Sequence, residues 1–406
     1  MTVPKLRFKE FSGDWCKLKV SEVTEYLVDG THFSPKSTEG EFKYITSKNI
    51  RNDGLDLTNI SYISRDDHES IYKRCKVKFG DILLTKDGAN TGNCCLNTLD
   101  EEFSLLSSVA VLRGEKEKFD NRFILQILQS DLGQNAILSS MAGQAISRIT
   151  LTKLKNYSFQ FPSIQEQTKI ASFLSAVDEK ISQLNQKHRL LCDYKQGMMQ
   201  KLFSQQLRFK ADDGGEFGEW EETTLDKKGI FLKGKGISKA DIVEDGILPC
   251  IRYGELYTQY GEVISKIISA TNLDSDSLVL SKANDVLIPA SGETQIDIAT
   301  ASCVLDDDIA LSGDLNIYRT KENGIFLSYL IRSHLKMQIA QLAQGNSVVH
   351  LYSSQLKTIK LNLPCLEEQT KIANFLSAID QKIEVVAQQI EQAKTWKKGL
   401  LQQMFV

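Results

Sequence analysis

The chain carries a long internal repeat. Residues 166–181 read EQTKIASFLSAVDEKI and residues 368–383 read EQTKIANFLSAIDQKI, so 13 of 16 positions are identical at an offset of 202 residues. The same offset relates KQGMMQKLF at 195–203 to KKGLLQQMF at 397–405. Agreement over this length is not a chance event, and a repeat of half the chain predicts two copies of one architecture.

Weaker similarities bring other parts of the two halves into correspondence. Each half opens with Leu-Arg-Phe-Lys, at 6–9 and again at 207–210, and a tryptophan follows each time. Gly-Asp-Ile-Leu at 80–83 corresponds to Asn-Asp-Val-Leu at 284–287. Between these positions the two halves diverge strongly. The pattern indicates a shared framework that carries different content in each half.

The repeated segments have the pattern of a coiled-coil helix. Aliphatic residues recur at alternating spacings of three and four over about four heptads. Ser163-x-x-Glu166 has the form of a helix capping box. Lys195 and Lys397 fall on apolar positions of the pattern, where a polar residue usually sets register or pairing. The residues assigned to the contact between the helices are Leu174, Val177, Ile181, Leu184, Leu191, Met198, Leu376, Ile379, Ile383, Val386, Ile390 and Leu400.

Each helix is expected to span about 38–40 residues, or roughly 57–60 Å. A helix of this length with a continuous apolar stripe needs a partner in water, and the other copy is the obvious one. About 160 residues separate the two helices, which is enough for a compact domain that returns the chain. We therefore expect antiparallel packing with pseudo-twofold symmetry.

The two divergent blocks have the pattern of mixed α and β structure, with strand-like runs separated by Gly, Asn and Asp turns. We expect strands at 43–45, 81–84, 107–112, 286–288 and 315–318, and helices at 122–128 and 325–335. The predicted fold class is α+β: two globular α/β domains separated by two long antiparallel coiled-coil helices. The predicted boundaries are 1–162 for the first domain, 163–205 for the first helix, 206–364 for the second domain and 365–406 for the second helix.

The predicted loops of both domains are expected to be exposed, and they are rich in polar and basic side chains of the types that read DNA. Arg and Lys recognise guanine, Asn and Gln recognise adenine, and glycine permits close approach of the backbone. Lysine and arginine also contact phosphates, which positions a protein without selecting sequence. The predicted DNA-binding residues are Thr46, Ser47, Lys48, Asn49, Lys86, Asn90, Thr91, Gln144, Ser147 and Arg148 in the first domain, and Lys233, Lys235, Arg252, Tyr253, Ser291, Gln295, Asn346 and His350 in the second.

Charge and cysteine content exclude several classes of protein. The formal net charge is −3, so any contact with nucleic acid must come from local groups of Lys and Arg. The eight cysteines include no C-x-x-C pair, which is typical of reduced thiols in a cytosolic protein. The N-terminus lacks the apolar core of a signal peptide, and no apolar run reaches the ~18 residues of a membrane span. We therefore expect a soluble, cytoplasmic protein.

Two short motifs resemble catalytic sites without completing them. Gly-x4-Gly-Lys-Gly at 229–236 lacks the Ser or Thr that binds Mg²⁺ in a P-loop. Asp178-x-Lys180 resembles part of a nuclease metal site, but it lies in the repeated helix and recurs as Asp380-x-Lys382, so we interpret it as a surface ion pair. No Gly-rich dinucleotide-binding fingerprint and no H-E-x-x-H or G-x-S-x-G motif occurs. We therefore assign no catalytic residue, metal ligand or cofactor to this chain.

The doubled helical motif resembles a known family. The pattern Pro-x-x-x-Glu-Gln-x-x-Ile-Ala-x-Phe-Leu-Ser-x-x-Asp-x-Lys-Ile occurs twice, each time ending near Lys-x-Gly-x-x-Gln. With the Leu-Arg-Phe-Lys opening of each half, it is similar to the specificity subunit of type I restriction–modification systems. The resemblance covers essentially the whole chain, and Cys365 departs from the family by standing where a second proline is usual.

This resemblance implies that each half carries a target-recognition domain that reads one half of an asymmetric bipartite DNA site. It implies that the helices set the spacer between the half-sites and dock the methyltransferase subunits. The implied partners are double-stranded DNA, two methyltransferase (M) subunits that hold S-adenosylmethionine, and restriction/translocase (R) subunits that use ATP and Mg²⁺. The chain itself would bind no cofactor and would not be catalytic.

Two other hypotheses remain open. A complete nuclease or methyltransferase with fused specificity domains would cleave or methylate DNA by itself when given Mg²⁺ and S-adenosylmethionine. A coiled-coil scaffold that does not bind DNA would show no sequence-specific retention of a bipartite oligonucleotide.

Overall fold

The computed structural model describes residues 4–141, 148–345 and 348–405. The chain divides into two compact units: unit 1 consists of residues 1–187 and 386–406, and unit 2 consists of residues 188–385. None of the helices in the described ranges is long and apolar enough to cross a membrane.

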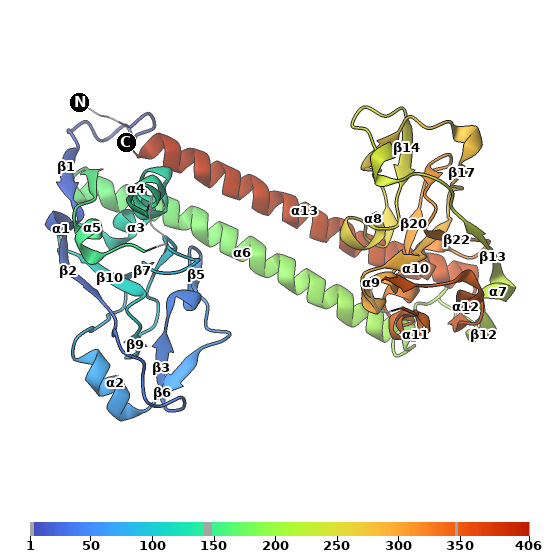
Figure 1. Ribbon diagram of the computed structural model, residues 1–406, viewed down its shortest axis with the longest axis horizontal. Helices are drawn as coiled ribbons and strands as arrows, with labels where there is room; N and C mark the ends of the chain where they lie inside the picture. The colour runs from blue at the N-terminus through green and yellow to red at the C-terminus, as the bar shows by residue number, and fades with distance from the viewer. Residues whose placement is uncertain (1–3, 142–147, 346–347, 406) are drawn as a thin grey trace. The chain divides into compact units, whose positions relative to one another are not determined.

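Both repeated segments form the expected helices. Helix α6 extends over Ile164–Phe203 and helix α13 over Leu366–Met404, inside the predicted ranges. In unit 1 the first part of α6 packs against the last part of α13 (Figure 1), and Leu174 and Leu400 belong to one core. In unit 2 the last part of α6 packs against the first part of α13, and one core contains Leu202 and Leu376. The two helices therefore run antiparallel in each unit, as predicted.

Unit 1 is built on a four-stranded antiparallel sheet with the order β2-β10-β7-β8. A second sheet has the order β6-β3-β9, and two further pairs are β1-β11 and β4-β5. The strands are β1 (Cys16–Lys19), β2 (Thr24–Asp29), β3 (Phe42–Ile45), β4 (Ile50–Arg51), β5 (Gly54–Leu55), β6 (Ser61–Ile63), β7 (Ile82–Thr85), β8 (Cys94–Leu96), β9 (Ser104–Leu105), β10 (Val109–Gly114) and β11 (Ser158–Phe161). The shorter helices are α1 (Val20–Val23), η1 (Ser47–Asn49), α2 (Arg65–Tyr72), α3 (Asn121–Gln129), α4 (Asp131–Met141) and α5 (Leu151–Lys155).

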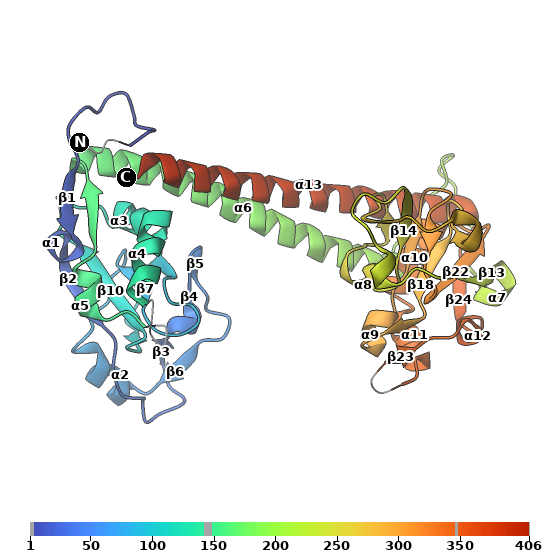
Figure 2. The ribbon, with the colours of Figure 1, turned by 45° about the horizontal axis from the view of Figure 1, so that its top comes forward.

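Unit 2 has a five-stranded sheet with the order β13-β22-β18-β20-β15 and a four-stranded sheet with the order β16-β14-β21-β17. Figure 2 labels β13, β18 and β22 of the first sheet and β14 of the second. Two further pairs are β12-β24 and β19-β23. The strands are β12 (Glu221–Thr224), β13 (Gly229–Lys233), β14 (Leu248–Ile251), β15 (Val263–Ile264), β16 (Ser269–Thr271), β17 (Val279–Leu280), β18 (Val286–Pro289), β19 (Ser291–Gly292), β20 (Ser302–Val304), β21 (Ala310–Leu311), β22 (Leu315–Thr320), β23 (Val349–His350) and β24 (Lys360–Leu363). The shorter helices are α7 (Leu225–Lys228), η2 (Lys239–Asp241), α8 (Glu255–Thr258), η3 (Ser275–Ser277), α9 (Gln295–Ile298), α10 (Gly324–Arg332), α11 (Lys336–Leu342) and α12 (Ser353–Leu356).

The two units share a framework. The order β2-β10-β7-β8 in unit 1 recurs as β13-β22-β18-β20 in unit 2. In each unit an arginine of the second strand makes a bidentate contact with the aspartate that precedes the third: Arg113 with Asp81, and Arg319 with Asp285, in each case as close as 2.7 Å. The weak Gly-Asp-Ile-Leu similarity therefore marks a repeated structural contact.

Local signals explain where the predicted elements begin and end. All five predicted strand segments overlap strands of the structure, and α3 contains the predicted range 122–128. Helix α3 begins after Asp120, whose carboxylate accepts a hydrogen bond from the Arg122 amide. The expected helix at 325–335 is too long, because α10 ends at Arg332. Ser333 has left the helical conformation there, and its hydroxyl bonds to the Tyr329 carbonyl.

Candidate nucleic-acid interface

In unit 1 the loops that follow β3 and β7 meet beside the segment that precedes β10. The Ser47 amide donates to Ser108 Oγ (3.2 Å), and the Lys86 amide donates to the Ser108 carbonyl (2.8 Å). The segment before α5 joins them, because the Ile149 amide donates to the Lys86 carbonyl (2.8 Å). These segments, residues 46–49, 86–91 and 148–150, are called the loop face of unit 1.

Unit 2 repeats this arrangement. The Tyr253 amide donates to Ser312 Oγ (3.3 Å), and the Ala290 amide donates to the Asp314 carbonyl (2.9 Å). The Leu351 amide in turn donates to the Ala290 carbonyl (3.0 Å). The loop face of unit 2 consists of residues 233–236, 252–254, 290–295 and 348–350. The loops selected by their composition thus converge on one surface in each unit.

Equivalent positions of the two loop faces carry unlike side chains. In unit 1, Asp87 and Arg148 form an isolated antiparallel bridge, and their side chains approach to 3.2 Å. The corresponding pair in unit 2 is Ser291 and His350, which pair where β19 meets β23. An ion pair in one unit is therefore replaced by a serine and a histidine in the other.

A second equivalent position reverses its charge. Asp29 is the last residue of β2, and Lys233 is the last residue of β13. Asp29 pairs with the residue of β10 that lies three positions before Arg113. Lys233 pairs with the residue of β22 that lies three positions before Arg319, so the two residues occupy the same place in the framework. Unit 1 therefore has a buried aspartate at this position, whereas unit 2 has an exposed lysine on its loop face.

The predicted residues of unit 1 differ in exposure. Lys48 is exposed, and the Arg148 side chain is half exposed beside Asp87. The other accessible members are partly buried: Thr46, Ser47, Asn90 and Thr91. Contact with a base edge from these residues remains a prediction.

Two predicted residues of unit 1 are not on an exposed loop. Lys86 is only 2% exposed, and its amino group lies 3.3 Å from Asp29 and 3.5 Å from Asp87. Asn49 is also 2% exposed; its side chain accepts from the Thr46 amide (3.0 Å) and donates to the Asp56 carbonyl (2.9 Å). The expectation of exposure was wrong for both residues. Each side chain is buried because it bonds to other polar groups of the loops, and these bonds hold the loops in place.

A hollow of about 990 Å³ lies on the loop face of unit 2. Four predicted residues line it: Lys233, Lys235, Arg252 and Tyr253. Lys233 and Lys235 are exposed, whereas Arg252 is held by Glu255 at 2.8 Å. The carboxylates of Glu293 and Asp314 also line the hollow. It therefore offers cationic donors suited to guanine or phosphate and anionic acceptors suited to the cytosine amino group.

The other predicted residues do not line this hollow or lie outside the described residues. Gln295 and His350 are exposed, but Ser291 is 4% exposed, so the expectation of an exposed side chain was wrong for Ser291. Its place in the β19–β23 pair turns the hydroxyl inward. Gln144, Ser147 and Asn346 lie outside the described residues.

Sequence reasoning missed several residues of the hollow in unit 2, among them a lysine and a tyrosine. Lys239 and Tyr257 line it beside Tyr253. Burial raises the pKa of Tyr257 above its ordinary value, so its hydroxyl is neutral at physiological pH. Tyr257 lies in the short helix α8, which was not among the predicted helices, and its ring centre is 6.5 Å from that of Tyr253, which precedes the helix.

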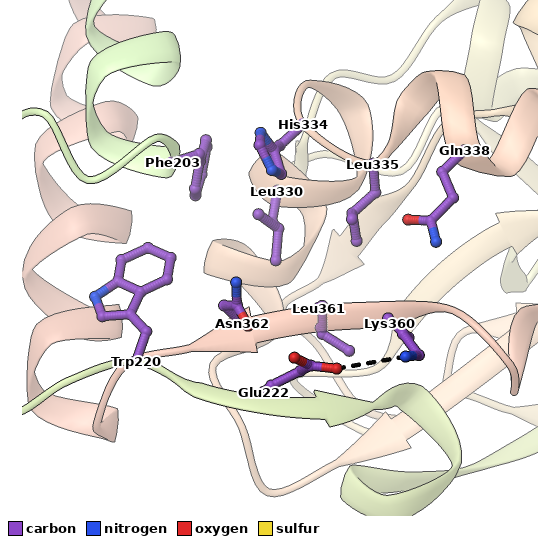
Figure 3. A pocket seen from close by; sticks show the side chains of 10 residues that line it. All are labelled: Phe203, Trp220, Glu222, Leu330, His334, Leu335, Gln338, Lys360, Leu361 and Asn362. Carbon is purple, nitrogen blue, oxygen red and sulfur yellow. Dashed lines mark ion pairs between the residues drawn. The ribbon is translucent and has the colours of Figure 1, made fainter.

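A smaller hollow of about 300 Å³ lies elsewhere in unit 2 (Figure 3). Phe203, Trp220 and Leu361 form part of its apolar wall, and His334, Gln338 and Asn362 add polar groups. Glu222 and Lys360 pair at its rim, 3.5 Å apart. None of the predicted DNA-binding residues lines this hollow.

The residues assigned to the helix contact are buried or partly buried. Those less than 9% exposed are Leu174, Val177, Leu184, Leu376, Ile379, Val386, Ile390 and Leu400. Those partly buried are Ile181, Leu191, Met198 and Ile383. Docking of partner subunits on the helices stays a prediction.

Asp178 forms an ion pair, as interpreted, but its partner is not on its own helix. Asp178 Oδ1 instead lies 2.6 Å from the amino group of Lys397 on α13, within unit 1. The repeated residue Asp380 behaves in the same way, 2.7 Å from Lys195 on α6 within unit 2. Lys195 and Lys397, which interrupt the apolar pattern, are thus paired across the helices.

No group of three or more His, Cys, Asp or Glu side chains in the described ranges is arranged to hold a metal ion. Burial raises the pKa of the thiols of Cys75, Cys95 and Cys303 to about 12 in each case. These buried thiols are therefore neutral at physiological pH, whereas a thiolate is the form that binds metal.

The family model of the type I restriction modification DNA specificity domain matches this chain twice, at residues 12–191 and 218–395. The chain belongs to this family. Each match covers one globular part and much of the long helix that follows it, so the family domain coincides with the internal repeat. The resemblance to type I specificity subunits is confirmed.

Named specificity subunits are similar over nearly their whole length. The chain is 26% identical to the putative type I restriction enzyme MjaX specificity subunit of Methanocaldococcus jannaschii, over 98% of this chain and 94% of that protein. It is also 26% identical to the type I restriction enzyme MjaVIII specificity subunit of the same organism, over 97% of this chain and 94% of the relative. A solved S subunit of a type I restriction–modification system from M. genitalium has the same fold, with a TM-score of 0.61 and 17% identity over 100% of this chain and 99% of that one.

Proposed function

We propose that this chain is the non-catalytic DNA-recognition subunit of a type I restriction–modification complex, and that each unit reads one half of an asymmetric bipartite site. The observation that carries the proposal is the pair of loop faces, built on one framework but with unlike side chains at equivalent positions. Asp87 and Arg148 in unit 1 correspond to Ser291 and His350 in unit 2. Two readers of this kind require two different half-sites.

The chemistry of the loop faces suits direct reading of bases. Lys48 and Arg148 in unit 1, and Lys233 and Lys235 in unit 2, supply cationic donors that are exposed. With a net charge of −3, the chain neutralises few phosphates by itself. We therefore expect weak, salt-sensitive binding by the isolated chain and tight, specific binding in the complex.

The partners follow from the family and from the repeat. Two similar helical segments suit two copies of one partner, which we take to be methyltransferase subunits that hold S-adenosylmethionine. Restriction subunits would supply ATP- and Mg²⁺-dependent translocation and cleavage. This chain would bind no cofactor, would act in the cytoplasm on DNA, and would use α6 and α13 to set the spacer between the half-sites.

The test is to express the chain with its methyltransferase partners in a host that lacks adenine methylation and to map methylated adenines by sequencing. We expect one bipartite motif with unlike halves and a constant spacer. In parallel, the pure chain is incubated with duplex DNA, Mg²⁺ and S-adenosylmethionine. Cleavage or methylation by the pure chain would establish a complete enzyme, and failure of the complex to bind or methylate a bipartite site would favour a scaffold without DNA specificity.

A further inference from the structure

In unit 1, Asp178 of α6 is bound from two sides. Lys397 Nζ of α13 lies 2.6 Å from Asp178 Oδ1, and Gln126 of α3 donates to Asp178 Oδ2 at 2.9 Å. Lys397 also reaches Gln129 of α3, 3.3 Å away. These four residues are called the Asp178 cluster. It joins both long helices to the helix that packs beneath the sheet of unit 1.

In unit 2, Asp380 of α13 has a corresponding set of contacts. Lys195 Nζ of α6 lies 2.7 Å from Asp380 Oδ1, and the Tyr329 hydroxyl of α10 donates to Asp380 Oδ2 at 2.5 Å. Lys195 also bonds both oxygens of Glu262 (3.0 Å each) and lies 5.1 Å from the centre of the Tyr329 ring. These four residues are called the Asp380 cluster.

The two clusters share their helix residues and differ in their third partner. Asp380 and Lys397 stand 202 residues after Asp178 and Lys195. Gln126 and Tyr329 occupy equivalent places, each six residues after the N-cap residue of α3 or α10. The pair that joins the helices therefore belongs to the repeated framework, whereas the partner from the globular part is particular to each unit.

Burial makes these contacts selective for one register. The side chains of Lys397 and Lys195 are 15% and 14% exposed, so neither ammonium group can turn fully to water. A slip of one helical turn would leave a partly buried charge without its partner, which is strongly unfavourable. Apolar residues of the pattern resemble one another and tolerate a slip far better. Burial also raises the pKa of Tyr329, which keeps its hydroxyl protonated as a donor to Asp380.

We propose that the Asp178 and Asp380 clusters are positioning devices for DNA recognition. Each fixes the register of α6 against α13 and attaches the recognition domain of its unit to that register through α3 or α10. The clusters would thereby determine which spacer length the complex accepts. This inference rests on the proposed function, in which two half-sites are read across a fixed spacer.

The experiment uses the full complex and a plasmid library in which the two wild-type half-sites are separated by spacers of many lengths. The variants are Lys397→Gln, the charge exchange Asp178→Lys with Lys397→Asp, and the control Lys394→Gln. Lys394 is an exposed lysine of α13 that pairs with Glu391, three residues earlier on the same helix. Methylation of each spacer class is counted by sequencing.

We expect Lys397→Gln to lower the preference for the wild-type spacer by about fivefold, the order expected for loss of one coupling between contacting residues. The sequences of the half-sites should not change, the charge exchange should restore the preference, and the control should behave as wild type. A uniform loss of methylation without a change of spacer preference would overturn the inference, because a merely structural role predicts that result. If the wild-type complex methylates no bipartite site, the proposed function fails first.

A second variant keeps the test decisive if Lys397→Gln does not fold. Tyr329→Phe removes the hydroxyl bonded to Asp380 and keeps the ring beside Lys195. It should broaden the accepted spacers without altering either half-site. An unchanged spacer distribution in a folded Tyr329→Phe complex would contradict a positioning role for the Asp380 cluster.

Discussion

Arg7 donates two hydrogen bonds of 2.7 Å, from Nε and Nη2, to the two carboxylate oxygens of Glu166. Arg208 repeats this contact with Glu368 at 3.1 and 2.8 Å. The Leu-Arg-Phe-Lys opening and the Glu-Gln start of each long helix are therefore two sides of one contact. It also explains why only half of the predicted capping box forms: Ser163 accepts from the Glu166 amide, but the Glu166 carboxylate bonds to Arg7.

Arg7→Ala is expected to destabilise unit 1. Glu166 is 1% exposed, and loss of its partner leaves a buried carboxylate uncompensated, which costs about 3 kcal/mol. The measurement is the free energy of unfolding in urea. Arg65→Ala is the control, because Arg65 pairs with Glu41 where both side chains are about 60% exposed. Equal effects of the two substitutions would contradict this account of the repeated contact.

Lysines of the loop faces should contribute to the salt dependence of DNA binding. Lys48→Ala and Lys235→Ala should each reduce the slope of log K against log salt by about 0.9, the value for one lost phosphate contact. Fluorescence anisotropy of the complex on duplex DNA measures the slope. The controls are Lys116→Ala and Lys321→Ala. Both lysines are exposed and follow the C-terminal ends of β10 and β22, whereas the loop faces lie at the N-terminal ends of these strands. A control substitution with the same effect would show that the loop faces are not the contact surface.

Leu361→Phe is expected to stabilise unit 2. Leu361 of β24 lines the smaller hollow, whereas the residue at the equivalent place in β11 of unit 1 is Phe159, which is buried. A phenylalanine at 361 should fill part of the hollow and add about 1 kcal/mol through extra buried apolar surface. Thermal unfolding of the two proteins provides the comparison. A lower melting temperature would mean that the hollow cannot take the ring without strain.

Cysteine reactivity should separate two classes of thiol. Cys16, Cys192 and Cys365 are exposed, and the other five cysteines are buried. Burial raises the pKa of Cys250 to about 11 and that of Cys75 to about 12. Iodoacetamide at pH 8 should therefore label three cysteines in the native protein and eight after denaturation, as counted by mass spectrometry. Rapid native labelling of Cys75 or Cys250 would contradict the buried placement.

The raised pKa values of the buried thiols also predict how the stability of the fold changes with pH. A folded thiol with a raised pKa binds its proton more tightly than the unfolded chain does, so its contribution is complete below the ordinary pKa of about 9 and declines as pH rises toward 12. The urea midpoint should therefore fall between pH 8 and pH 10. Cys75→Ser and Cys303→Ser would reduce this decline if these thiols cause it.

The long helices were predictable because a heptad pattern is local and repeats. The positions of the loops were predictable, because turn residues and polar composition mark them. The roles of single side chains in the loops were not predictable. In the sequence Lys86 resembles an exposed basic residue. Its burial depends on a contact with Asp29, which lies far earlier in the chain. Lys195 and Lys397 were recognised as exceptions in the pattern, whereas their partners Asp380 and Asp178 depend on the antiparallel register, which sequence spacing does not specify.

The central claim is that unlike loop faces on a repeated framework read unlike half-sites. The most direct measurement is to replace residues 206–362 with the corresponding block of another specificity subunit and to map methylated adenines in cells that express the full complex. The account predicts that one half-site changes while the other half-site and the spacer stay the same. A change in both half-sites, or in neither, would contradict it.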